Sequence, residues 1–328
     1  SPSSGYLVYC DRTKMALIIL EGPDASGKST LAKALNKQLT RGTTKVVHSG
    51  PPVTSHLLEE YMLPLVDYKP KHDMHIVLDR WHLGEFVYPE IHGRETLITR
   101  ETLAYLELFL LSRGAVLVQV NADPLALRNR RAARGEDTLD ITEIHQEMSL
   151  FFQAAAHSRL PFVFAQTSGW DTEATPEKWA ETILKHAFYE EMVASRLAKY
   201  TTYVGPRNPN VLIIGDQRGQ TDPRYPTAFA PLPNTSGLYL LKSLPSAVLS
   251  SASIGFVNAN EGDNVAELWE DLGRPHAVAL GHMAISGTLR AGLTEFGRVP
   301  HPQYIRRFHH DRASDYGRLI MDVAESKE

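Results

Sequence analysis

The stretch Met15-Ala-Leu-Ile-Ile-Leu-Glu21, followed by Gly22-Pro-Asp-Ala-Ser-Gly-Lys-Ser29, decides the fold of the first half of this chain. The apolar run predicts a buried strand. From Gly27 onward, apolar residues are spaced for one face of a helix, namely Leu31, Ala34, Leu35 and Leu39. The residues between them match GxxxxGK[ST], and a strand before and a helix after are the context that confirms this motif. The stretch therefore predicts a phosphate-binding loop.

The residue types in this loop suit a nucleotide triphosphate. Its glycines let backbone N–H groups face phosphate oxygens, and the N-terminus of the following helix favours negative charge. Lys28 is expected to reach the β and γ oxygens, and Ser29 to ligate magnesium. The predicted nucleotide contacts are Gly22, Ala25, Ser26, Gly27, Lys28, Ser29 and Thr30. The sequence therefore predicts ATP and Mg²⁺ at this loop.

The rest of the first half alternates between strand and helix patterns. Strands are expected at His75–Leu78, Ala115–Val120 and Pro161–Gln166, and helices at Arg100–Ser112 and from Pro176 to about Tyr200. This alternation predicts an α/β fold with a parallel sheet and helices on both faces.

Chain length and breaker residues indicate two domains. A single core rarely grows beyond about 250–300 residues, and this chain has 328. Chain breakers fill Gly205-Pro-Arg-Asn-Pro209, and a new strand, Val211–Ile214, follows at once. We predict an N-terminal extension at 1–14, a first α/β domain that carries the phosphate-binding loop at 15–203, and a second α/β domain at 204–328.

The composition is that of an ordinary globular protein, with 43% hydrophobic and 22% charged residues. A net charge of −4 gives no global basic field, so contact with nucleic acid would need a local basic patch. The single cysteine, Cys10, excludes an intrachain disulfide and a Cys-based zinc site. No apolar run is long enough to span a bilayer, so we expect a cytoplasmic protein.

Two motifs resemble those of thymidylate kinases and related nucleoside and nucleotide kinases. Glu21 to Thr30 is similar to their loop, including the acidic Asp24, and Asp79-Arg80-Trp81 resembles their Asp-Arg-aromatic motif. The resemblance implies that Asp24 faces the acceptor, that Asp79 organises magnesium, and that Arg80 bridges donor and acceptor phosphates. It predicts an ATP-dependent kinase. A strand-end ion pair is the alternative for Asp79 and Arg80.

The same resemblance extends to two further segments. Glu85 and Tyr88 fall where the family has acceptor-facing residues, although they also suit ordinary helix positions. Leu125 to Asp140 resembles the family's arginine-rich lid, which implies catalytic roles for Arg128, Arg131 and Arg134. Its other members are Arg130 and Asp137. Such cations suit phosphoryl transfer, which spreads charge over the phosphate oxygens. A solvated basic helix is the alternative.

The second half resembles uracil-DNA glycosylases through several short segments in the right order. These are Val211 to Gly219, Asn234 to Gly237 before the leucine-rich Leu238–Leu244, Ile254 to Asn258, Ala277 to Ala284, and Val299 to Gln303. The resemblance implies roles for Asp216, Asn258 and His301 in binding or excising a base. Gly-Asp-Gln-Arg-Gly and His-Pro-Gln depart from the family's usual forms, which favours a retained base-binding or DNA-binding role over catalysis.

A DNA acceptor follows from the two resemblances together. The tail from Tyr304 to Arg312 supplies cations and aromatic rings, and we expect Arg306 and Arg307 to contact DNA phosphates. A solvated helix is the alternative. The whole resembles phage 5-hydroxymethyluracil DNA kinases, which implies phosphorylation of a hydroxyl on a modified pyrimidine in DNA. Two other readings stay open: a free-nucleotide kinase with an inert appended domain, and a DNA repair or binding protein with glycosylase-like activity and a nucleotide switch.

Overall fold

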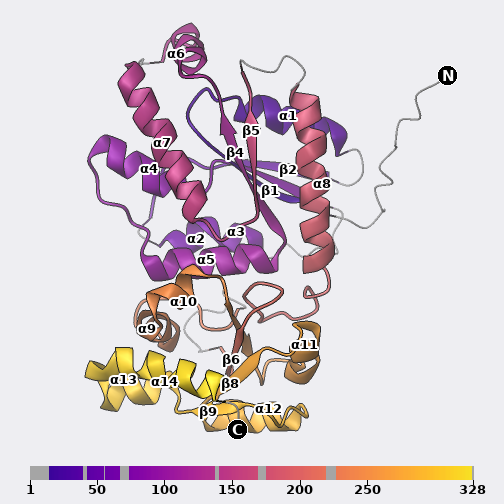
Figure 1. Ribbon diagram of the computed structural model, residues 1–328, viewed down its shortest axis with the longest axis vertical. Helices are drawn as coiled ribbons and strands as arrows, with labels where there is room; N and C mark the ends of the chain where they lie inside the picture. The colour runs from indigo at the N-terminus through magenta and orange to yellow at the C-terminus, as the bar shows by residue number, and fades with distance from the viewer. Residues whose placement is uncertain are drawn as a thin grey trace, which may run out of the picture.

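The computed structural model describes residues 15–39, 43–54, 56–66, 74–136, 140–168, 175–218 and 227–326. The N-terminal extension predicted at 1–14, Cys10, Asp137 and Gly219 lie outside these residues. Two α/β halves lie one above the other along the long axis of the molecule (Figure 1). Each half is built on a parallel sheet of its own, which confirms the predicted α/β class.

The first sheet has five parallel strands in the order β2-β3-β1-β4-β5. Their bounds are β1 Leu17–Glu21, β2 Thr43–His48, β3 Met74–Asp79, β4 Ala115–Asn121 and β5 Phe162–Gln166. The side chains of β1 and most of β3 and β4 are buried, because both faces of a parallel sheet are covered by helices. All five carboxyl ends lie at one edge.

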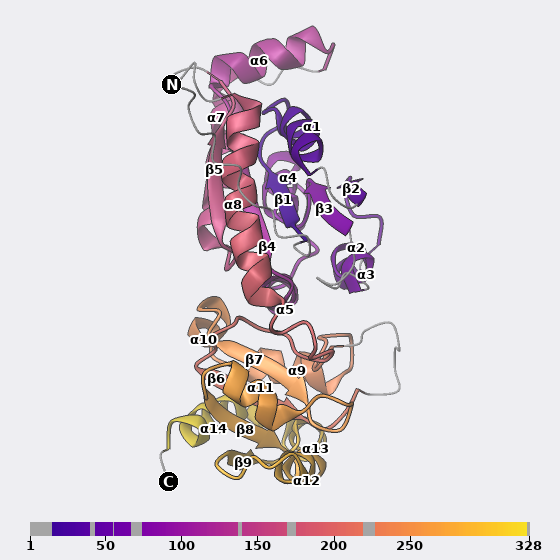
Figure 2. The same ribbon diagram turned by 90° about the vertical axis from the view of Figure 1, so that its right-hand side faces the viewer.

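Helices cover both faces of this sheet (Figure 2). Helices α1 (Lys28–Gln38) and α8 (Pro176–Ala194) pack one face through an apolar core that includes Leu35, Ile183, Ile18 and Val118. The opposite face lies against α5 (Arg100–Ser112) and α7 (Ile141–His157), and α4 (Gly84–His92) packs against α7. The remaining helices are α2 (Leu57–Tyr61), α3 (Leu63–Val66) and α6 (Pro124–Ala133).

The structure corrects one expectation about the first half and adds two details that the sequence did not give. The helix expected to reach about Tyr200 ends at Ala194, and the chain then turns so that Leu197 and Tyr200 enter the core of the second half. Within the segment read as an arginine-rich lid, Leu125 to Asp140, the residues up to Ala133 belong to α6, and Asp140 caps the N-terminus of the next helix, α7. Strand β2 was not predicted, because as an edge strand it buries none of its side chains, which are all exposed or partly buried.

The second sheet has four parallel strands in the order β7-β6-β8-β9. Their bounds are β6 Val211–Gly215, β7 Ile254–Asn258, β8 His276–Leu280 and β9 Gly297–Val299. The surrounding helices are α9 Ser236–Ser243, α10 Ser246–Ser250, α11 Val265–Asp271, α12 His282–Arg290, α13 Pro302–Phe308, α14 Ala313–Glu325 and the 3₁₀ turn η1 His310–Arg312. The expected strand at 211–214 and the expected strand-to-helix step at 277–284 are confirmed.

The two halves share one continuous hydrophobic core. The Tyr105 hydroxyl of α5 donates to Thr227 Oγ1 at 2.8 Å and contacts the carbonyl oxygen of Ala228. Arg159 Nε donates to the carbonyl oxygen of Leu249 at 2.6 Å. An apolar, hydrogen-bonded joint of this kind fixes the halves relative to each other. The boundary at 203/204 stays a prediction.

Among the helices in the described part of the chain, none combines the length and the apolar character needed to cross a membrane.

Candidate functional site

The loop between β1 and α1 adopts backbone conformations that its sequence makes possible. Gly22 has φ 144°, and a Cβ there would lie 2.0 Å from the carbonyl oxygen of Val120. Gly27, with φ 101°, caps α1 in the left-handed region. Both positions therefore require glycine. The first N–H groups of α1 have no acceptor within the helix, so the loop ends in a site suited to an anion.

Lys28 is buried at the centre of this loop. Its ammonium donates to the carbonyl oxygens of Gly22 at 2.6 Å and Pro23 at 2.7 Å. Burial, together with the nearby Arg80 guanidinium, lowers the pKa of Lys28 to about 8, although carboxylates around it act in the opposite direction. A desolvated cation next to the loop backbone is well placed to attract a phosphate oxygen.

Ser29 and Asp79 meet at the start of α1 and the end of β3. Ser29 Oγ lies 3.4 Å from Asp79 Oδ2, and Asp79 Oδ1 is buried without a hydrogen-bond partner among the described residues. These oxygens fit magnesium, which prefers hard oxygen ligands and commonly uses one or two side chains besides phosphates and water. No cluster of three or more His, Cys, Asp or Glu suited to a metal occurs in the described part of the chain.

Arg80 and Asp24 form an ion pair across the site. Arg80 has φ 63°, an uncommon conformation for a residue with a side chain, and directs its guanidinium at Asp24 from the end of β3. The Tyr88 hydroxyl lies 3.3 Å from the same carboxylate. The structure therefore brings together Asp24, Asp79, Arg80 and Tyr88, and their predicted roles toward magnesium and an acceptor stay predictions.

Glu85 takes a different position from the one expected for an acceptor-facing residue. It is buried and receives two hydrogen bonds from Arg94, at 2.6 Å and 3.2 Å. Because both carboxylate oxygens are engaged, Glu85 holds the half-exposed Arg94 in place. Of this ion pair, only the Arg94 guanidinium is therefore partly open to solvent, beside α4.

The arginines of α6 separate into two groups. Arg131 is buried, forms an ion pair with Glu147 of α7, and donates to the carbonyl oxygen of Asp24 at 3.1 Å and 3.2 Å. Arg130 donates to the carbonyl oxygen of Ala25 at 3.2 Å. The other two lie away from the loop: Arg128 is exposed with no bond to the described residues, and Arg134 lies 3.6 Å from Glu136. Only the first group joins α6 to the loop.

Sequence reasoning missed several side chains of this site. Glu21 is fully buried, and its Oε1 accepts hydrogen bonds from the backbone N–H groups of Trp81 and Leu83 at 2.9 Å and 3.0 Å. Burial raises the pKa of its carboxyl group. His48 Nδ1 lies 3.3 Å from Asp79 Oδ2. Glu21 could have been found from its place at the end of β1, whereas His48 required the pairing of β2 with β3.

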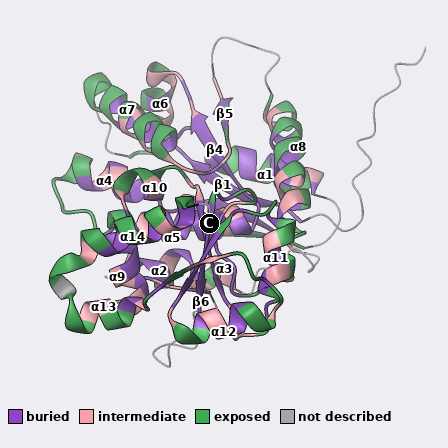
Figure 3. Ribbon diagram, turned by 60° about the horizontal axis from the view of Figure 1, so that its bottom comes forward, coloured by how far each residue is buried: buried purple, intermediate pink, exposed green. Residues whose placement is uncertain are grey.

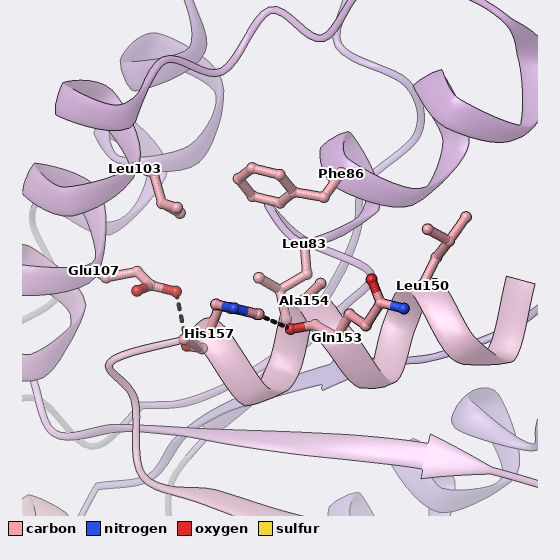
Figure 4. Close-up of a pocket in the computed structure, with 9 residues that line it drawn as sticks. Leu83, Phe86, Leu103, Glu107, Leu150, Gln153, Ala154 and His157 are labelled. Carbon is pink, nitrogen blue, oxygen red and sulfur yellow. Dashed lines mark hydrogen bonds between the residues drawn. The ribbon is translucent and has the colours of Figure 1, made fainter. Parts of the chain in front are cut away.

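A cavity of about 290 Å³ lies between α4, α5 and α7. Phe86 and Leu83 point into it, and Glu107 forms part of its wall (Figure 4). Glu107 accepts four hydrogen bonds, from His82, Ser158 and twice from Arg159. Although burial alone would raise its pKa, these donors lower the pKa to about 2. The carboxylate is therefore saturated and stabilises the segment that follows Arg80.

The predicted residues of the second half meet at the carboxyl edge of its sheet. Asp216 follows β6, Asn258 ends β7 and His301 follows β9. Asn260 donates to Asp216 at 2.6 Å, and Asn258 donates to Glu261 at 2.7 Å. Burial lowers the pKa of His301, although the Asp216 carboxylate acts in the opposite direction. In open α/β sheets, ligands bind outside this edge.

Helix α13 begins beside this edge, because His301 caps its N-terminus. Its outer face is largely exposed (Figure 3). Arg307 and the ring pair Tyr304 and Phe308, with centroids 5.0 Å apart, lie on it. Arg306 instead contacts the carbonyl oxygen of Asn234. Of the two arginines expected to contact DNA, only Arg307 is fully open to a ligand.

Comparison with known proteins finds a relative that matches about half of the chain. No protein-family profile matches. An uncharacterised SPbeta prophage-derived protein, YorR of Bacillus subtilis strain 168, is 28% identical over 163 residues, which are 48% of this chain and 90% of YorR. Its crystal structure, in complex with phosphorylated GDP, aligns at 24% identity with 52% of this chain and 94% of that chain, at a TM-score of 0.42.

Two nucleotide-kinase structures give weaker alignments. Deoxyadenosine kinase from M. mycoides, with bound dCTP, is 13% identical over 51% of this chain and 98% of its own, at a TM-score of 0.34. Thymidylate kinase from Candida albicans is 16% identical over 56% of this chain and 93% of its own, at 0.33. The resemblance of its second half to uracil-DNA glycosylases stays a prediction.

Proposed function

We propose that this chain is a magnesium-dependent phosphotransferase that moves the γ-phosphoryl group of ATP to a nucleoside-type or nucleotide-type acceptor. One observation carries the proposal: Lys28 and Ser29 of the loop lie in one site with Asp79 and Arg80 from the end of β3. Catalysis of phosphoryl transfer consists mostly of positioning and charge stabilisation, and this site offers both.

The step itself is an in-line displacement. An acceptor oxygen forms a bond to the γ-phosphorus, the bond to the β,γ-bridging oxygen of ATP breaks, and ADP leaves with that electron pair. The acceptor hydroxyl proton passes to Asp24 or Asp79. The developing negative charge is stabilised by Lys28 and by Arg80, which also pairs with Asp24. Arg131 fixes the loop by donating to the carbonyl oxygen of Asp24. Magnesium, held by Ser29 and Asp79, would neutralise charge on the phosphates.

For the acceptor, we propose a hydroxymethyl group on a pyrimidine in DNA, that is, 5-hydroxymethyluracil. The carboxyl edge of the second sheet supports this acceptor, because Asp216, Asn258 and His301 gather there beside exposed aromatic rings and Arg307. Enzymes that act on a base in a duplex must extrude it, and aromatic side chains stack on unpaired bases.

Two further functions compete with this one. A free-nucleotide kinase of the thymidylate type would need only the first half. A DNA repair or binding protein would do its chemistry at the second edge and use the loop as a nucleotide switch.

One assay separates the three functions. The protein is incubated with γ-labelled ATP and magnesium, and with dTMP, plain DNA, uracil-containing DNA or 5-hydroxymethyluracil-containing DNA in turn. We expect label only in the DNA that carries 5-hydroxymethyluracil. Label in dTMP alone would contradict the DNA acceptor while leaving the phosphotransferase intact. Base excision from uracil DNA, with only slow ATP hydrolysis, would favour the repair function.

A further inference from the structure

Gln119 on β4 is a buried amide that the fold leaves unsatisfied. It is 1% exposed, and neither its Oε1 nor its Nε2 has a hydrogen-bond partner among the described residues. Burying an amide without hydrogen bonds costs stability, so native proteins keep very few such groups. Those that remain tend to lie at functional sites.

Glu21 lies beside Gln119 on the neighbouring strand. The two residues are paired in the register of β1 and β4, so their side chains project from the same face of the sheet. Glu21 uses Oε1 to accept two backbone hydrogen bonds, while its Oε2 has no partner in the described part of the chain. An unsatisfied carboxylate oxygen and an unsatisfied amide are therefore neighbours.

Asn121 continues this row toward the edge of the sheet. It stands two positions after Gln119, on the same side of β4, and its Oδ1 also lacks a partner among the residues described. We call Glu21, Gln119 and Asn121 the polar row. It leads to the carboxyl edge where the loop and Asp79 lie. Its face is the one covered by α5 and α7, opposite the face on which α1 lies (Figure 2).

We infer that Gln119 is an acceptor-positioning residue, whose amide pairs with a planar edge of the acceptor that presents one donor and one acceptor side by side. The carboxamide of Gln119 has an acceptor oxygen and a donor NH₂ in one plane, so it can form two hydrogen bonds to such an edge. A pyrimidine base presents an edge of this kind. The inference rests on the proposed function, since it assigns the acceptor to the α5 and α7 side of the loop. Glu21 Oε2 accepts one further hydrogen bond from the same ligand.

The test is Gln119→Met, which keeps the side-chain volume and removes both polar atoms. No hydrogen bond to the described residues is lost, so the free energy of unfolding should stay the same or rise. The KM for the acceptor should increase about tenfold or more, the loss expected for hydrogen bonds to a substrate edge. The kcat and the KM for ATP should change little. Gln38→Met is the matched control, because the Gln38 amide has a protein partner: it donates to the carbonyl oxygen of Glu177 at 2.7 Å. The same substitution there removes a hydrogen bond within the protein and should leave the KM for the acceptor unchanged.

Equilibrium binding keeps this inference separate from the proposed function. Thymidine and a 5-hydroxymethyluracil-containing oligodeoxynucleotide are titrated into the wild-type chain and into Gln119→Met, without ATP. Weaker binding to the variant supports the inference even if no phosphoryl transfer occurs. A variant that is destabilised, an acceptor KM that does not change, or a wild-type chain that binds neither probe would overturn it.

Discussion

Ser29 Oγ and Asp79 Oδ2 lie 3.4 Å apart, although 50 residues separate them in the chain. They meet because β3 pairs directly with β1, so the end of β3 lies beside the loop that follows β1. Asp79 also lies 3.3 Å from His48 at the end of β2. Three carboxyl ends of adjacent strands thus build the side of the site that suits magnesium.

Asp79→Asn should weaken the response to magnesium. The substitution keeps the shape of the side chain but removes the charge that Mg²⁺ favours. We expect kcat/KM to fall by about 100-fold at a fixed magnesium concentration, in line with the loss of one charge-stabilising group. A magnesium titration of the transfer rate would check this, and an unchanged half-saturating concentration would contradict the assignment.

Arg131→Met should be strongly destabilising. The change leaves the Glu147 carboxylate, which is buried, without its cation. Breaking a buried ion pair from one side costs about 3–5 kcal/mol. Arg128→Met is the matched control on the same helix, because Arg128 is exposed, and its free energy of unfolding should change by less than about 0.5 kcal/mol. If urea denaturation gave the same loss in the free energy of unfolding for Arg131→Met and Arg128→Met, the division of the α6 arginines into two groups would be wrong.

Tyr105→Phe tests the joint between the halves. The ring stays in the shared core, but the hydrogen bonds to Thr227 and Ala228 are lost. We expect a loss of about 1–3 kcal/mol in the free energy of unfolding, and faster amide exchange at residues 227–229. Tyr239→Phe should be nearly neutral, because the Tyr239 hydroxyl has no partner in the described part of the chain. Equal losses in the free energy of unfolding for Tyr105→Phe and Tyr239→Phe would show that the joint between the halves does not depend on the Tyr105 hydroxyl.

His301 should titrate below its ordinary pKa of 6.5. Burial disfavours its charged form, so between the folded pKa and 6.5 the unfolded chain binds more protons. The contribution of His301 to stability therefore falls as the pH drops through 6.5. Asp216→Asn should lower the pKa of His301 further, because the carboxylate acts to raise it. An NMR titration measures both values, and a pKa that rises in the variant would contradict the placement of these two residues.

The sequence predicted those parts of the site that depend on local pattern. The GxxxxGK[ST] spacing beside an apolar strand predicted the loop, and the resemblance to nucleoside and nucleotide kinases pointed to Asp24, Asp79 and Arg80, which lie together with the loop in the structure. Other features depend on packing between distant segments. Glu147 lies 16 residues after Arg131 on another helix, and only the packing of α6 on α7 pairs them.

Glu85 and the α6 arginines show the same limit. The family resemblance implied that Glu85 faces the acceptor, but its pairing with Arg94 depends on the turn at Gly93. Arg128 and Arg131 stand three positions apart on α6, a spacing that puts two side chains on one helix face, yet one is exposed and the other buried, because α7 covers only part of that face. The rotation of a short polar helix is set by tertiary contacts rather than by its own sequence.

The most direct test of the central claim is whether the γ-phosphoryl group of ATP moves to an organic acceptor at the loop of Lys28. The wild-type chain and Lys28→Ala are incubated with γ-labelled ATP, magnesium and the acceptor panel, and label in the acceptor is separated from label in free phosphate. We predict acceptor labelling by the wild-type chain, reduced at least about 100-fold in Lys28→Ala. Label that appears only in free phosphate, or transfer that Lys28→Ala leaves unchanged, would contradict a phosphotransferase centred on this loop.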